Sequence, residues 1–156
     1  MATRYLHPRS PVMHDVSSPP ALLLSVQESR HQALIRLGNA RPIFLQGAFP
    51  FAGRGFFEPT ILHNDLRYTV PEGCTSEIVY FRAGNLSDDL VYVNLWADGQ
   101  ALRYFPIGPK NDCHVSLAIV EPHLAGTQIE VRLAAPRGLT GSLVIDIGLL
   151  EIREGG

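Results

Sequence analysis

The strongest constraint in this sequence is the stretch LVYVNLWADGQALRYFP, residues 90–106, which has the pattern of a single β-hairpin. Asp98 and Gly99 suit a two-residue turn in which both residues have positive φ, and strand-forming residues flank them. Because cross-strand partners share a face, this turn predicts two faces: one with Val91, Val93, Leu95, Leu102 and Tyr104, the other with Tyr92, Asn94, Trp96, Arg103 and Phe105. Both faces are too apolar for water. One can form a core, and the second needs another cover.

Composition favours one globular domain. The chain has 156 residues, of which 46% are hydrophobic and 18% charged, with a net charge of -2. A chain of this length can bury roughly two thirds of its unfolded surface, which is enough for a core of its own. No cluster of Lys and Arg supplies the attraction on which nucleic-acid binding depends. We therefore expect no nucleic-acid partner.

The start of the chain lacks the apolar segment of a signal peptide, and the apolar runs elsewhere are too short to span a membrane. The sequence therefore predicts a cytoplasmic protein without a membrane partner. Cys74 and Cys113 are the two cysteines. Two cysteines in a chain of this length do not form a disulfide framework, so we expect two reduced thiols.

The first 20 residues carry prolines at positions 8, 11, 19 and 20, a spacing that excludes a regular helix and predicts an extended arm. The next segments, 21–26 and 32–37, are expected to be short strands, although QESRHQALIRL (27–37) would also allow a helical turn or two.

Most of the remaining chain has the period of two that is typical of strands. The clearest examples are 127–135 and 142–152, whose apolar positions predict core residues Ile129, Val131, Leu133, Leu143, Ile145 and Ile147. Gln128, Glu130 and Arg132 alternate with the first three and predict a solvent-exposed face. Eight to ten short strands between Gly and Pro turns predict a single antiparallel β-sandwich over 21–152, jelly-roll-like or immunoglobulin-like, followed by a tail at 153–156. A small β-barrel is the alternative.

No catalytic signature emerges from the sequence. Histidines occur at positions 7, 14, 31, 63, 114 and 123, without an HxH, CxxC or HExxH motif. Cys113 and His114 are neighbours on a predicted strand and so point to opposite faces. A GxSxG motif is also missing. We therefore assign no catalytic residue, no metal and no cofactor, and the sequence favours a non-enzymatic protein.

The candidate binding residues are on the second face of the hairpin and in the Gly-rich segment FAGRGFFEP, residues 51–59. They are Tyr92, Asn94, Trp96, Arg103, Phe105, Arg54 and Phe56. Tyr, Trp and Arg are enriched at the centres of protein interfaces. We therefore predict a binding or assembly module that acts as a homo-oligomer or as the accessory subunit of a larger complex.

Two alternatives stay open. Flat aromatic rings beside polar groups also stack on sugars, so Trp96, Tyr92 and Arg103 would serve a carbohydrate-binding module with a glycan as partner. The other alternative is a small cupin-like metal-dependent enzyme, in which a barrel mouth gathers histidines. The missing HxH motif disfavours that enzyme.

Overall fold

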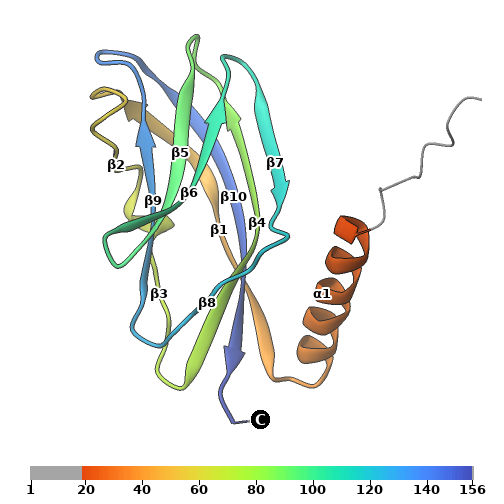
Figure 1. The fold of residues 1–156 in the computed structure, drawn as a ribbon. Helices are drawn as coiled ribbons and strands as arrows, with labels where there is room; N and C mark the ends of the chain where they lie inside the picture. The colour runs from red at the N-terminus through yellow and green to blue at the C-terminus, as the bar shows by residue number, and fades with distance from the viewer. Residues whose placement is uncertain (1–18, 156) are drawn as a thin grey trace, which may run out of the picture.

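The computed structural model describes residues 19–155, which form a β-sandwich of two antiparallel sheets with one helix beside it (Figure 1). The elements in chain order are α1 (Pro19–Arg36), β1 (Ala40–Ala52), β2 (Thr60–Ile61), the short 3-10 helix η1 (Asn64–Leu66), β3 (Tyr68–Thr69), β4 (Cys74–Asn85), β5 (Val91–Ala97), β6 (Gln100–Ile107), β7 (Asp112–Ser116), β8 (Pro122–His123), β9 (Gln128–Ala134) and β10 (Thr140–Arg153). The prediction of a single antiparallel β-sandwich is confirmed.

The strands pair in a nested order. In sheet A the order is β1-β10-β4-β7, with β8 also paired to β4, and in sheet B it is β2-β9-β5-β6, with β3 also paired to β9. The first strand therefore pairs with the last, the second and third with the next to last, and so on inward to the β5–β6 hairpin. A long hairpin rolled up in this way is a jelly roll, which selects among the topologies that the sequence left open.

The core lies between the two sheets and contains the predicted residues. Ile129, Val131, Leu133, Leu143, Ile145 and Ile147 are all buried in it. Phe81 of sheet A stacks on Phe105 of sheet B, with ring centroids 3.9 Å apart. This stack joins the two sheets near the centre of the sandwich.

The hairpin has the predicted turn but not the predicted faces. Asp98 and Gly99 both have positive φ, 48° and 78°. Trp96 pairs with Ala101 as expected, but Leu95 pairs with Arg103, so Leu102 is an extra residue in a β-bulge. Beyond the bulge the predicted pairs are therefore wrong by one residue.

The bulge exchanges the faces of two aromatic rings. Phe105 points into the core and Tyr104 points out, the reverse of the prediction. This arrangement buries the ring that has no polar group and leaves the tyrosine hydroxyl in water, where it needs no protein partner.

The segments predicted as strands at 21–26 and 32–37 form one helix, α1. Pro19 and Pro20 begin it, because the first helical turn has no internal partner for the N–H groups that proline lacks. Gly38, with φ of 73°, ends it: its N–H donates to Ile35 O, and the Asn39 N–H donates to Leu34 O. Of the predicted arm, residues 1–18 lie outside the described residues. The sandwich itself begins at Ala40.

Helix α1 lies against the outer face of sheet A (Figure 1). Its main polar attachment is Glu77 of β4, which accepts hydrogen bonds from Arg30 at 2.9 and 3.0 Å and forms a 2.9 Å hydrogen bond with His31. Burial by itself would raise the pKa of the Glu77 carboxyl, but the hydrogen bonds from Arg30 and His31 outweigh it and leave the pKa lowered. Glu77 therefore stays charged and holds the helix through ionic hydrogen bonds.

Candidate functional site

The outer face of sheet B brings together several predicted binding residues. Tyr92, Asn94 and Trp96 of β5 point away from the core, since Val91, Val93 and Leu95 between them point into it. We use the name aromatic face for Phe56, Tyr92, Trp96 and Tyr104 together with Phe57, the residue that follows Phe56 in its loop. Two of its members, Phe57 and Tyr104, were missed by the sequence analysis. The bulge hid Tyr104, and Phe57 lies within the segment that supplied Phe56.

The loop between β1 and β2 is fixed onto this face. The Phe56 ring stacks on Tyr92 with centroids 6.2 Å apart, and the Tyr92 hydroxyl donates to the Phe56 carbonyl oxygen. The Gly55 N–H donates to Ala135 O at 2.8 Å, and the Gly53 N–H donates to Leu139 O at 2.7 Å. The next side chain in this anchored loop, Phe57, is 99% exposed. The fold therefore holds one apolar ring entirely in water.

The other end of the face is a cation–π stack. The Arg132 guanidinium lies 4.0 Å from the centre of the Trp96 ring and donates to Glu130, which also accepts a 2.6 Å hydrogen bond from Arg67. Glu130 is buried, so the prediction of a fully solvent-exposed face on β9 is wrong at this residue. Burial tends to raise the pKa of Glu130, and the two arginines reverse that effect and lower it. Arg132 thus covers one side of Trp96.

Asn94 lies in the middle of the face and lacks partners. Its side chain is 0% exposed, and within residues 19–155 neither its amide nitrogen nor its amide oxygen has a hydrogen-bond partner. Its cross-strand neighbours are Tyr104 on β6 and Arg132 on β9. The indole N–H of Trp96 is also buried and has no hydrogen-bond partner among the described residues. Polar groups that stay buried and unpaired cost free energy.

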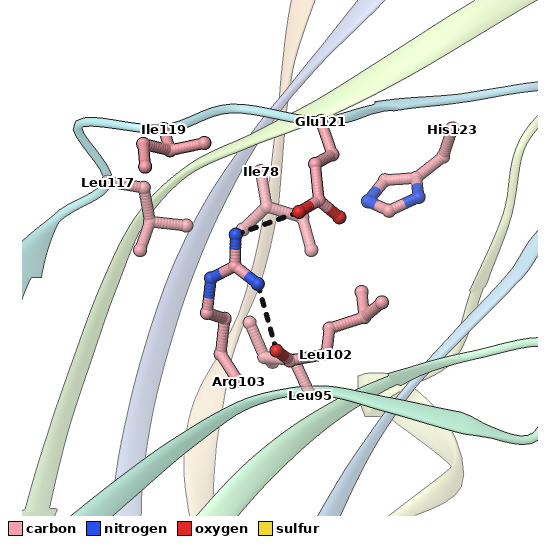
Figure 2. A pocket seen from close by; sticks show the side chains of 8 residues that line it. All are labelled: Ile78, Leu95, Leu102, Arg103, Leu117, Ile119, Glu121 and His123. Atoms are coloured by element: carbon pink, nitrogen blue, oxygen red, sulfur yellow. Dashed lines mark hydrogen bonds and ion pairs between the residues drawn. The ribbon is translucent and has the colours of Figure 1, made fainter.

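Three predicted residues lie elsewhere. Phe105 is in the core, as described above. Arg103 reaches into the open edge between the sheets, where it donates to Glu121 and to the Leu102 carbonyl, each at 2.9 Å (Figure 2). Arg54 is exposed in the β1–β2 loop and has no ion-pair partner in the described part of the chain.

The edge around Arg103 is a small pocket. Figure 2 shows its apolar lining of Ile78, Leu95, Leu102, Leu117 and Ile119, with Glu121 and His123 beside Arg103. Its volume is about 20 Å³, which is room for about one water molecule. Burial lowers the pKa of His123, which favours the neutral form of its ring. The pocket is too small for an organic substrate, and the Arg103–Glu121 pair closes the edge of the sandwich.

The remaining candidate ligands are dispersed. Cys113 packs against the core, and His114 lies on the outer face of sheet A, where it accepts a hydrogen bond from Arg82. Between residues 19 and 155, no three His, Cys, Asp or Glu side chains lie close enough together to hold a metal ion. Nor does that part of the chain contain a helix long and apolar enough to cross a membrane.

These features define a jelly-roll β-sandwich with a helix on one sheet and an aromatic face on the other. No protein-family model matches the sequence, and no curated protein matches it.

Three solved structures are similar to the chain at low identity. The structure of infectious bursal disease virus Gt strain is 13% identical with a TM-score of 0.43, over 75% of this chain and 34% of the viral one. The CBM36-1 domain of a multidomain xylanase from the hindgut metagenome of Trinervitermes trinervoides is 14% identical with a TM-score of 0.39. The match covers 70% of this chain and 96% of that domain. The structure of Bacillus endospore appendages, described as a family of disulfide-linked pili, is 8% identical with a TM-score of 0.37. The match covers 74% of this chain and 91% of that one. The chain spans about a third of the viral protein's length.

Proposed function

We propose that this protein is a non-enzymatic assembly module that associates with further copies of itself through the aromatic face. The observation that carries this proposal is the 99% exposure of Phe57 on a loop fixed by backbone hydrogen bonds. Because backbone hydrogen bonds already fix the loop, binding through Phe57 would order mainly its side chain, and aromatic side chains dominate the binding energy of protein interfaces. Tyr104, 59% exposed and in contact with the Tyr92 ring, adds apolar surface on β6.

Pairing through the free edge of β1 is disfavoured as the mode of association. β1 is an edge strand of sheet A. The Arg153 N–H donates to Asn39 O and the Gly53 N–H donates to Leu139 O, so the odd-numbered residues of β1 face β10. Pro42 and Pro50 therefore face the free edge and interrupt its row of N–H donors. We therefore propose contact through side-chain surfaces and not through the β1 edge.

The residues predicted to bind a glycan, Trp96, Tyr92 and Arg103, are poorly placed for one. Arg132 covers one side of the Trp96 ring, and the Tyr92 hydroxyl already donates to a carbonyl of this chain. Arg103 points away from both rings, to the edge between the sheets where it binds Glu121. Stacking on sugars needs open ring faces, and Tyr104 is the ring of β5 and β6 that is mainly exposed.

Co-capture of two differently tagged copies of the full chain tests the proposal. We expect the wild-type copies to capture each other, and Phe57→Ala to weaken capture by about 30-fold or more, the usual effect of losing an aromatic anchor. Leu124→Ala is the matched control, because Leu124 is exposed outside the aromatic face. Failure of wild-type copies to capture each other would refute self-association. Retardation by glycans in affinity electrophoresis would support a carbohydrate-binding module instead.

A further inference from the structure

A groove separates helix α1 from the outer face of sheet A. Its volume is about 330 Å³, and its walls include Ile35 of the helix, Pro42 and Phe44 of β1, and Tyr80 of β4. Phe44 is 54% exposed although it is a large apolar side chain. The helix is held to the sheet through Glu77, so the apolar groove beside that contact stays unfilled by the described residues.

The floor of the groove depends on one glycine. A Cβ at Gly148 of β10 would lie 2.2 Å from the Tyr80 ring, so only glycine lets that ring lie flat across the strand. The Tyr80 hydroxyl donates to Asp146 at 2.9 Å and fixes the ring there. The groove is therefore a shaped surface with an aromatic floor.

The groove matches Phe57 in size and in charge. A cavity of about 150 Å³ is enough to hold benzene, so 330 Å³ accepts a phenylalanine ring together with part of its loop. Glu28 lines the groove, and no ion-pair partner for it occurs within residues 19–155. Arg54, three positions before Phe57, also has no ion-pair partner within residues 19–155. An unpaired cation thus accompanies the exposed ring, and an unpaired anion accompanies the groove.

We propose that Phe57 of one copy inserts into the groove between α1 and sheet A of a second copy, with Arg54 facing Glu28. This rests on the proposed self-association and names the partner surface. Figure 1 shows the loop before β2 and helix α1 on opposite sides of the sandwich, so a molecule cannot fill its own groove. The contact is then head to tail, and it builds a ring or a filament according to whether the rotation closes.

Mixing two variants tests this arrangement. Phe57→Ala removes the inserted ring and keeps the groove, whereas Phe44→Glu places a charge in the groove and keeps the ring. We expect each variant to be monomeric alone and their equimolar mixture to form a dimer, because one intact contact is left between them. Val144→Glu is the control: Val144 is exposed on the same sheet face but does not line the groove, so this variant should assemble like wild type.

A charge exchange provides a second test that does not depend on the variant at Phe44. Arg54→Glu should weaken association, and adding Glu28→Arg in the same chain should restore it. Circular dichroism confirms that each variant is folded. If Phe44→Glu and the charge exchange leave association unchanged while Phe57→Ala abolishes it, Phe57 binds another surface and this inference is overturned. A monomeric wild-type protein would instead refute the proposed function itself.

Discussion

Two buried asparagines, Asn94 and Asn85, differ in how many hydrogen bonds their side chains form. Asn94 is fully buried with neither amide atom bonded to any described residue. Asn85, also buried, donates to the carbonyls of Asp89, Ile107 and Gly108 and accepts from the backbone and hydroxyl of Ser87. The same substitution should therefore have opposite effects at the two positions.

Asn94→Leu removes a buried polar group that has no partner. Leaving such a group unpaired costs about 1–3 kcal/mol, so this variant should be more stable by about that amount. Asn85→Leu breaks a satisfied network and leaves several buried partners unpaired, which should cost about 3 kcal/mol or more. The increase in side-chain size is the same in both variants, so the comparison separates hydrogen bonding from packing.

Urea unfolding followed by far-UV circular dichroism measures both changes. For a chain of this size, a change of 1 kcal/mol also shifts the melting temperature by roughly 2–4 °C, which gives an independent readout. Equal destabilisation by Asn94→Leu and Asn85→Leu would contradict this prediction. That result would mean that the Asn94 amide is hydrogen-bonded in solution.

Three further predictions concern the core, a buried carboxylate and the helix. Ile145→Ala should lower the free energy of unfolding in urea by about 2–5 kcal/mol, because Ile145 is fully buried. Val144 beside it is exposed, so Val144→Ala should change that free energy by no more than about 0.5 kcal/mol. Equal changes would contradict the assigned faces. Glu130→Ala should cost about 2 kcal/mol, since it removes the buried acceptor of two arginines, and a neutral effect would show that the carboxylate is dispensable. The pKa of Glu77 is lower in the fold than in the unfolded chain, so its stabilisation is complete above the unfolded pKa and is lost as the pH falls through the folded one. The helical circular dichroism signal should fall over that acidic range in wild type and depend less on pH in Glu77→Gln.

The sequence predicts the sandwich because its last strands obey a simple period. Ile129, Val131 and Leu133 are apolar at alternate positions, as are Leu143, Ile145 and Ile147. Burial of one face is enough to determine which way such strands point. The hairpin turn at Asp98 and Gly99 is equally local, because its conformation depends on two residues.

Helix α1 was missed because its apolar residues do not form a stripe with the period of a helix. The signals that identify it are at its ends, where Pro19 and Pro20 begin it and Gly38 ends it. Between 21 and 37 only Val26 and Ile35 are β-branched, a composition that favours a helix over strands.

The candidate site was predicted in part, and the errors have tertiary causes. Tyr92, Asn94, Trp96 and Phe56 come together as expected, since β5 keeps its alternation. The bulge at Leu102 moves Phe105 into the core and Tyr104 out of it. No local pattern marks the extra residue, because the competition between the two rings for the core decides its place. The groove under α1 depends on distant segments and has no signature in the sequence.

The mass of the wild-type protein, measured by sedimentation equilibrium from low to high micromolar concentration, tests self-association most directly. Self-association through Phe57 predicts a mass that rises above the monomer value of 17.2 kDa with concentration, and a Phe57→Ala variant that stays at that value. A wild-type protein that stays at the monomer mass throughout, or a Phe57→Ala variant that assembles like wild type, would contradict self-association through Phe57.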